Sequence, residues 1–207
     1  MSLIHKSYDL IKILNKILEN KSYSDIAKSI NVAIGTVKRW NELKNVPGAY
    51  TFELLKLANI DIEYSKFSYK EKDQFFTPAN TSNYCYSKFI EIITKYDDSE
   101  ENYTFIEPSA GNGVFLKLLP KDRRIGFDIE PKFSEIQKQD YLDWNPTENK
   151  KYIVIGNPPF GLRGQLALKF INHSSEFADY VCFILPQLFE SDGKGVPRKR
   201  VLGLNLI

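Results

Sequence analysis

The chain has 207 residues, of which 43% are hydrophobic and 26% are charged, and its formal net charge is +2. This length allows one medium-sized domain and a small one, and the composition is that of an ordinary globular protein. No apolar run approaches the roughly 20 residues of a membrane span, and the N-terminus lacks the pattern of a secretory signal. We therefore expect a cytoplasmic protein with no membrane contact.

The charges are distributed unevenly. Residues 1–60 hold 9 basic and 5 acidic side chains, whereas the rest of the chain holds 19 basic and 21 acidic ones. A basic small module on a near-neutral body suits contact with a polyanion, and random scatter is the alternative. Cys85 and Cys182 have no CxxC spacing, which predicts reduced, buried thiols. No cluster of metal ligands is visible, so no metal is expected.

Residues 1–60 carry the periodicity of helices. Apolar side chains recur at helical spacing over 10–18, and 52–60 forms a further apolar helix that would close a bundle. Two more helices are predicted on either side of Asn31, because asparagine tolerates the left-handed conformation of a tight turn. The side chains expected to face inward from these two helices are Ile26, Ala27, Ile30, Val37 and Trp40.

This pair of helices resembles a helix-turn-helix of the repressor type. The resemblance implies that Thr36, Lys38 and Arg39 lie on the exposed face of the recognition helix and contact DNA. A helical bundle that only packs on the rest of the protein is the alternative interpretation.

The pattern changes after a polar, aperiodic segment at 61–74, which we interpret as a linker. Over 75–207, strands alternate with helices, which predicts an α/β domain with a mostly parallel sheet flanked by crossover helices. Strands are expected at 103–106, 124–128, 134–137, 152–155 and 180–185, and helices near 82–96, 113–119 and 164–177.

A glycine-containing loop follows the first predicted strand. Glycine lets the backbone approach a ligand and tolerates positive φ, and a loop leading from a strand to a helix suits a nucleotide-like cofactor. The spacing differs from the G-x-G-x-x-G pattern of NAD-binding proteins, so NAD is not favoured. The candidate cofactor-binding residues of this loop are Glu107, Pro108, Ser109, Ala110, Gly111 and Gly113.

Further cofactor contacts are predicted at the next two strands. Asp128 ends the second strand, where a carboxylate can accept hydrogen bonds from two ribose hydroxyls, and Ile129 would lie against the cofactor adenine. Asp140 can accept a hydrogen bond from the cofactor amino group, and Tyr141 can flank its ring.

The tetrapeptide Asn157-Pro158-Pro159-Phe160 lies at the C-terminal end of the buried strand predicted at 152–155. Ligand sites of open α/β sheets lie at such strand ends. The two prolines restrict the backbone, so the Asn157 side-chain oxygen and the Pro158 carbonyl can both accept from one amino group. Phe160 supplies a stacking face.

The segment Gln74-Phe75-Phe76-Thr77-Pro78 completes the set of motifs. Together the motifs, over roughly residues 74–187, resemble the adenine-N6 DNA methyltransferases, which have a Rossmann-like fold. The resemblance implies S-adenosyl-L-methionine as the cofactor, with Phe76, Thr77 and Pro78 at its methionine end and Asn157 also in contact with it. It implies that Asn157–Phe160 grip the amino group of an adenine flipped out of double-stranded DNA. A restriction-modification system would add a cognate restriction endonuclease as partner.

Other functions share some of these features. An adenine-N6 RNA methyltransferase uses the same chemistry. A methyltransferase of protein glutamine amides also joins a helical domain to Asn-Pro-Pro, but it usually has tyrosine in place of Phe160 and lacks the Phe-Phe-Thr-Pro element. A non-enzymatic DNA-binding regulator built on a degenerate methyltransferase is a third alternative, favoured by the helix-turn-helix.

The resemblance also has limits. Methyltransferases of this group have about seven strands and a separate target-recognition region, whereas this chain offers five, with a sixth starting at 201–207. We therefore expect the methyltransferase domain to be incomplete at its C-terminus. The basic segment 194–200 is interpreted as a loop near the active site, with phosphate contact and plain solvation as alternatives.

Overall fold

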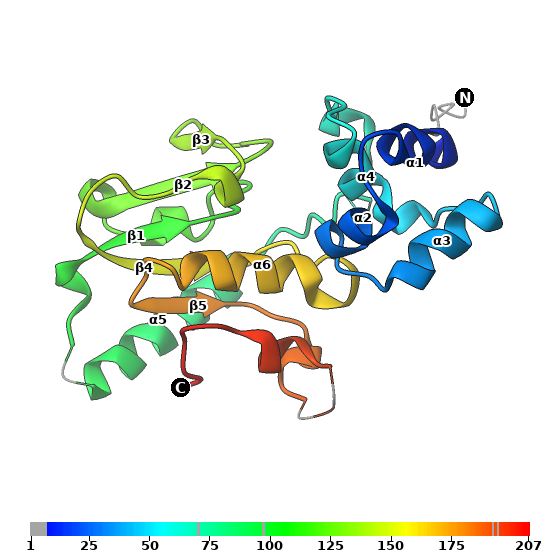
Figure 1. The fold of residues 1–207 in the computed structure, drawn as a ribbon. Coiled ribbons are helices and arrows are strands. Elements are labelled where there is room, and N and C mark those ends of the chain that lie inside the picture. Colours follow the sequence, from blue (N-terminus) through cyan, green and yellow to red (C-terminus); the bar gives the residue numbers. More distant parts are fainter. Residues whose placement is uncertain (1–7, 70, 97, 192, 194) are drawn as a thin grey trace. The chain divides into compact units, whose positions relative to one another are not determined.

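The chain divides into two compact units, residues 1–72 and 73–207. Their structure comes from a computed structural model, which describes residues 8–69, 71–96, 98–191, 193 and 195–207 (Figure 1). Each unit has a hydrophobic core of its own. The first is helical, and the second is built on a sheet.

The helical unit contains α1 (Leu10–Leu18), α2 (Tyr23–Ser29), α3 (Ile34–Glu42) and α4 (Thr51–Leu57). The inward-facing residues predicted for the two central helices are all buried, as are residues of α1 and α4 that pack against them. The core of this unit consists of Ile13, Leu14, Ile17, Ile26, Ala27, Ile30, Val37, Trp40, Val46, Leu54 and Leu55.

A short turn joins α2 to α3. Asn31 has a φ of 56°, the left-handed conformation that its side chain predicted. The Val32 amide donates to the Ala27 carbonyl at 2.9 Å, and the Asn31 amide donates to Lys28 at 3.3 Å. These are the two hydrogen bonds of a Schellman motif, which ends α2 and redirects the chain into α3. The DNA-binding role of this helix pair stays a prediction.

The segment interpreted as a linker packs instead on the helical unit over most of its length. Tyr64–Lys66 forms a 3-10 turn, and the Tyr64 ring lies 5.7 Å from that of Phe52. The Phe67 ring packs edge-on against Phe52 at 4.8 Å. The aromatic residues in a segment that is otherwise polar explain the difference, because each buries apolar area against α4.

The second unit is built on a five-stranded, all-parallel sheet in the order β3-β2-β1-β4-β5 (Figure 1). This is a Rossmann-like arrangement. All five predicted strands are present, with small differences in their bounds: β1 (Tyr103–Glu107), β2 (Arg124–Asp128), β3 (Ile136–Lys138), β4 (Lys151–Gly156) and β5 (Tyr180–Phe183).

One helix covers each face of the sheet (Figure 1). On α5 (Ala79–Lys95), Phe89 and Ile93 pack in one cluster with the side chains of β1 and β4 that point to that face. On α6 (Gln165–Ser174), Phe170 packs with the alternate side chains, Ile106 and Val154. Among the described residues, no helix is both long enough and apolar enough to cross a membrane. Cys85 and Cys182 are free and partly buried.

Two predicted elements are wrong. The region 113–119 forms only the 3-10 turn Leu116–Leu118. Pro120 follows directly, and proline disfavours the helical conformation in the residue before it. The region 201–207 is not a strand, because the Leu202 amide donates to the Asn172 side chain on α6 at 3.0 Å rather than to a sheet edge.

Candidate active site

The carboxyl ends of β1 and β4 meet at the centre of the sheet. From β1 the chain continues to β2 on one side, and from β4 it continues to β5 on the other. The loops that follow these two strands therefore diverge and leave a crevice, which is where open α/β sheets bind ligands. The glycine loop follows β1 and the Asn-Pro-Pro-Phe tetrapeptide follows β4, so both predicted motifs lie at this switch point.

The glycine loop is fastened to the end of β2. Gly111 and Gly113 have φ values of 52° and 75°, which favour glycine. The Gly111 amide donates to Oδ2 of Asp128 at 2.7 Å, and the Ala110 amide donates to the Phe127 carbonyl at 2.8 Å. Two motifs 17 residues apart are thus held together by a buried hydrogen bond.

Asp128 is 8% exposed, and its other oxygen accepts from the Glu130 amide at 2.7 Å. A carboxylate offers about four lone-pair positions, so each oxygen can accept once more. Ile129, the next residue, is 36% exposed. The structure therefore places a carboxylate with spare acceptor capacity beside an exposed apolar side chain.

The Asn157 amide is oriented by the segment that precedes α5. Nδ2 of Asn157 donates to Oγ1 of Thr77 at 3.2 Å and faces the Phe75 carbonyl at 3.4 Å. Because a carbonyl can only accept, the group facing Phe75 must be the NH2 end. Oδ1 of Asn157 is consequently the free end, and it is buried with no hydrogen-bond partner among the described residues.

The same segment also contacts the far end of the tetrapeptide loop. Oδ2 of Asp73 accepts from the Gly161 amide at 2.5 Å. Phe76 packs on the glycine loop, since a Cβ added at Gly111 would lie 3.3 Å from its ring. Residues 73–77 therefore touch both ends of the loop at 157–161 and bridge it to the glycine loop.

The remaining tetrapeptide residues are also fixed by contacts. Pro158 is buried, and no described residue donates a hydrogen bond to its carbonyl. Phe160 is partly buried against an apolar cluster of α6, and its carbonyl accepts from the Leu166 and Ala167 amides at 3.1 and 3.2 Å. Pro159 is partly exposed.

Glu107 was predicted to contact the cofactor, but its side chain does not face the crevice. Its side chain is 2% exposed, and Oε2 accepts from the Leu116 amide at 2.6 Å. Burial raises the pKa of this carboxyl to about 8. Glu107 thus holds the glycine loop from inside the protein, which corrects its assignment as a direct cofactor contact.

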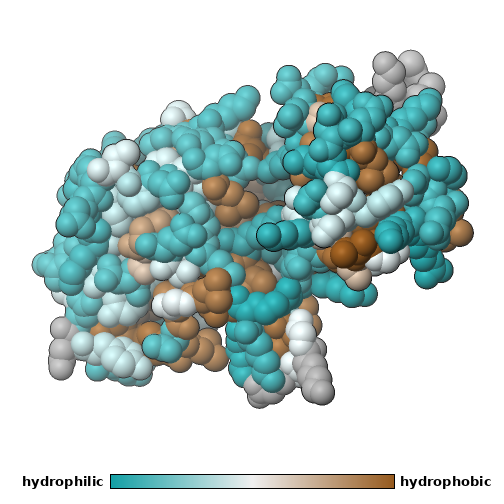
Figure 2. All heavy atoms as spheres, viewed as in Figure 1, coloured by the Kyte–Doolittle hydropathy of each residue, from teal (hydrophilic) through white to brown (hydrophobic). Residues whose placement is uncertain are grey.

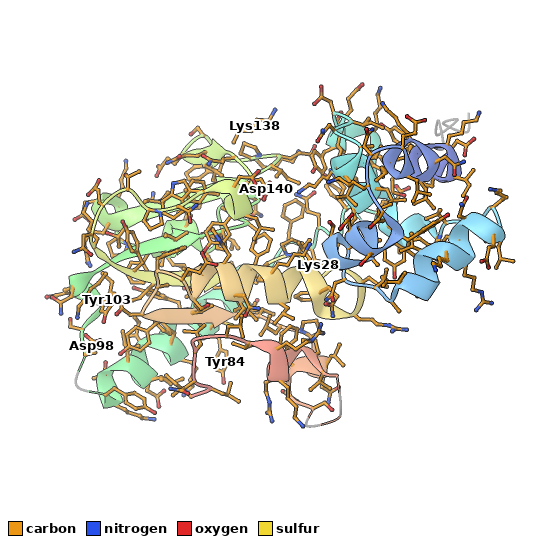
Figure 3. The ribbon with its side chains drawn as sticks, viewed as in Figure 1. Lys28, Tyr84, Asp98, Tyr103, Lys138 and Asp140 are labelled. Atoms are coloured by element: carbon orange, nitrogen blue, oxygen red, sulfur yellow. The ribbon has the colours of Figure 1, made fainter. Side chains whose placement is uncertain are left out.

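Tyr141 is also part of the core and not of the site. Its ring is 1% exposed and packs among Phe127, Trp144 and Phe170. Its hydroxyl forms a 2.7 Å hydrogen bond with Ser174. A ring without exposed surface cannot flank a ligand, so this assignment is corrected. Asp140 is partly exposed, and it lies at the end of the sheet opposite to Asp98 and Tyr103 (Figure 3).

The other predicted residues are placed as follows. The Ser109 hydroxyl donates to the Asn157 carbonyl at 3.1 Å and so links the two loops, whereas Pro108 and Ala110 are buried. Pro78 is the N-cap residue of α5. In the helical unit, Lys38 and Arg39 are exposed on α3 and Thr36 is partly buried.

The sequence alone assigned no role to two residues of this segment, Asp73 and Gln74. Asp73 contacts Gly161 across 88 positions of the chain, and Oε1 of Gln74 is a second buried acceptor that finds no partner in the part of the chain that the structure describes. The only available signal was their position next to the Phe-Phe-Thr-Pro element.

Among the described residues, no group of three or more histidine, cysteine, aspartate or glutamate side chains is placed to hold a metal ion. Comparison of the chain with protein-family models, with curated proteins and with solved structures found no match.

Proposed function

We propose that this chain is an S-adenosyl-L-methionine-dependent methyltransferase that methylates the N6 amino group of adenine in DNA. The observation that carries the proposal is Oδ1 of Asn157, a buried acceptor at the carboxyl end of β4 to which no residue described by the structure donates. A buried acceptor without a donor is costly, and such a group in a folded protein points to a ligand that brings the donor. An exocyclic NH2 group is a donor of this kind.

Two acceptors are needed to make an adenine amino nitrogen reactive. Its lone pair is delocalised into the ring, which makes it a poor nucleophile. Asn157 Oδ1 and the Pro158 carbonyl, each accepting one N–H, would localise that lone pair on nitrogen. These hydrogen bonds strengthen as positive charge develops on nitrogen, so they stabilise the transition state more than the ground state. The methylated nitrogen then releases its extra proton to water.

The residues present fit the proposed cofactor. When bound, S-adenosyl-L-methionine supplies an electrophilic methyl group. Asp128 has spare acceptor capacity for ribose hydroxyls, and Ile129 offers apolar surface to an adenine ring. The Thr77 hydroxyl accepts from Asn157 and can still donate to a carboxylate, and the Phe76 ring is 40% exposed beside Gly111.

The substrate base must leave its stack, because the amino group of a paired adenine is out of reach inside a duplex. Phe160 is the aromatic side chain of the tetrapeptide and offers a stacking surface for the flipped base. The Phe-Phe-Thr-Pro segment favours DNA as the substrate over protein glutamine amides, because it is the element that resembles the adenine-N6 DNA methyltransferases. In the structure this segment contacts both the tetrapeptide and the glycine loop.

The test is expression in a host that has no adenine methylation. Genomic DNA is digested to nucleosides, and N6-methyladenine is quantified by mass spectrometry. A signal from the wild type that disappears in Asn157→Ala supports the proposal. A folded wild type that binds S-adenosylhomocysteine but leaves DNA unmethylated contradicts it, and labelled cofactor would then be offered to RNA and to glutamine-containing peptides.

A further inference from the structure

Two basic turns lie next to each other in the sheet unit. The first, Leu162–Gly164, follows the tetrapeptide and leads into α6. The second, Pro197–Arg200, comes from the end of the chain that follows β5. These two turns contain four basic side chains and no acidic one. The basic residues are Arg163, Arg198, Lys199 and Arg200.

The second turn is fixed to the start of α6. A Cβ added at Gly164 would lie 3.4 Å from the Pro197 ring, so the two turns are in contact. Nη1 of Arg200 donates to Oε1 of Gln165 at 3.0 Å, and the Arg200 carbonyl accepts from Asn172 at 3.1 Å. Figure 2 shows hydrophilic and hydrophobic residues mixed at the surface of this C-terminal part of the unit, where the exposed apolar side chains include Leu188, Leu202 and Leu206.

Arg163 occupies a conformation that an arginine rarely adopts. Its φ is 53° and its ψ is 34°, in the left-handed region, and its side chain is exposed. A glycine would form the same turn without strain. Within the described residues, the Arg163 guanidinium forms no ion pair that would compensate for the strain. Strained residues beside a reactive site point to a functional role for the side chain.

Arg200 has an unused donor. Its Nε is buried and has no acceptor among the described residues, although Nη1 is held by Gln165. A guanidinium presents its N–H groups as a planar fork that matches the oxygens of a phosphate. The arginine is thus held in place with part of its donor set unpaired.

We propose that this pair of turns, which we call the basic turns, binds backbone phosphates of the DNA that carries the target adenine. The identity of this polyanion as DNA rests on the proposed function. Arg163 is six residues from Asn157, a separation of at most about 20 Å, so the phosphates it contacts lie close to the target nucleotide. Such contacts fix the register of the nucleic acid without reading its sequence.

The test uses the full chain and a short fluorescein-labelled DNA duplex, with affinity measured by anisotropy over a range of salt concentrations. The variants are Arg163→Gly, Lys199→Gln and their combination, each in the wild type and in a Lys38→Ala/Arg39→Ala background that removes the predicted contribution of α3. Arg163→Lys retains the charge. Lys121→Gln, an exposed lysine at the amino end of β2, is the matched control.

Each removed charge should weaken binding to every duplex sequence alike and lower the slope of log affinity against log salt by about 1. Arg163→Gly should melt at or above the wild-type temperature, because it relieves the left-handed strain, so its lost affinity cannot come from misfolding. Arg163→Lys and Lys121→Gln should bind like the wild type.

Wild-type affinity and salt slope in the Arg163→Gly/Lys199→Gln protein would overturn the proposal, whether or not the wild type methylates DNA. A larger loss of affinity for an RNA hairpin or for polyglutamate than for the duplex would also overturn it. Reduced duplex binding in a protein that transfers no methyl group to DNA would leave the basic turns as a DNA-binding surface while contradicting the proposed function.

Discussion

The two ends of the Asn157 side-chain amide differ in their hydrogen bonding. Its NH2 end is held by Thr77 at 3.2 Å, and its oxygen is buried and unpaired among the residues that the structure describes. Asn157→Ala removes the free acceptor from the site but leaves Asp128 and the glycine loop unchanged. We expect methyl transfer to fall by at least about 100-fold, the usual effect of deleting one transition-state hydrogen bond.

The dissociation constant of S-adenosylhomocysteine, measured by calorimetry, should change little in Asn157→Ala. Thr77→Ser is the control, since it keeps the hydroxyl that orients the amide. A variant that loses cofactor binding and turnover in equal measure would show that Asn157 belongs to the cofactor site and not to the amino-group site.

Glu107 gives a prediction about pH. Burial raises its folded-state pKa to about 8, whereas the unperturbed carboxyl has a pKa of 4.5. Between these values the folded protein keeps a proton that the unfolded chain has released, so this group lowers the free energy of unfolding as pH rises. Glu107→Gln has no proton to lose, so its urea midpoint should decline less from about pH 5 to about pH 8 than that of the wild type.

If the urea midpoints of the wild type and of Glu107→Gln fall equally steeply with pH, Glu107 is ionised in the folded protein. The comparison depends only on the slopes, because glutamine can change the absolute stability through its contact with Leu116.

The sequence predicted the ends of the strands better than the direction of individual side chains. Asn157 and Asp128 were found because each comes directly after a buried apolar run. Glu107 ends β1 and Tyr141 lies in the turn that follows β3, but both side chains turn into the core, where Glu107 accepts from Leu116 and Tyr141 bonds Ser174. Which way a polar side chain turns depends on partners far along the chain, and the sequence around it does not contain them.

At the scale of elements, both the backbone conformation and the space available restrict which residue can stand at position 113 in the loop after β1. Gly113 has a φ of 75°, and a Cβ there would lie 2.8 Å from the Phe133 ring. Gly195 has the same φ of 75°, but among the described residues other than its chain neighbours no atom lies within 4 Å of an added Cβ. Gly113→Ala should therefore destabilise the sheet unit by about 1–3 kcal/mol more than Gly195→Ala, by the cost of overpacking.

Chemical denaturation of both glycine variants measures this difference. In a Phe133→Ala background, Gly113→Ala should cost less than it does in the wild type, since the added methyl then has room. Equal destabilisation by Gly113→Ala and Gly195→Ala would mean that left-handed strain alone, without the Phe133 contact, makes glycine necessary.

The elements themselves were predictable where local signals were strong. Strands β1, β4 and β5 are short apolar runs, and α1–α4 follow from apolar periodicity and from Asn31. β3, with the sequence Ile-Gln-Lys, has no such pattern. The helix predicted at 113–119 failed because Gly113 is left-handed and Pro120 disfavours the helical conformation at Leu119, so that only the 3-10 turn Leu116–Leu118 forms between them. The Phe-Phe-Thr-Pro element marked residues 74–78 as part of the site, but the hydrogen bonds that residues 73–77 make to the tetrapeptide loop could not be predicted, since they join residues 80 and 88 positions apart.

At the scale of the whole molecule, the two cores can be followed separately by fluorescence. The chain has two tryptophans: Trp40 lies in the core of the helical unit, and Trp144 packs in the core of the sheet unit. Trp144→Phe leaves a probe of the helical unit, and Trp40→Phe leaves a probe of the sheet unit. A ligand that binds only the folded sheet unit stabilises that unit by about 2.7 kcal/mol at a hundredfold excess over its dissociation constant.

We therefore expect S-adenosylhomocysteine to raise the melting temperature reported by Trp144 and to leave that reported by Trp40 unchanged. Asp128→Ala should abolish the shift, because it removes the carboxylate proposed to hold the ribose. An equal shift at both probes would mean that the two units unfold as one cooperative block in spite of their separate cores. If S-adenosylhomocysteine does not shift the melting temperature of the wild type, the chain does not bind the proposed cofactor. The function proposed for Asn157 would then be wrong as well.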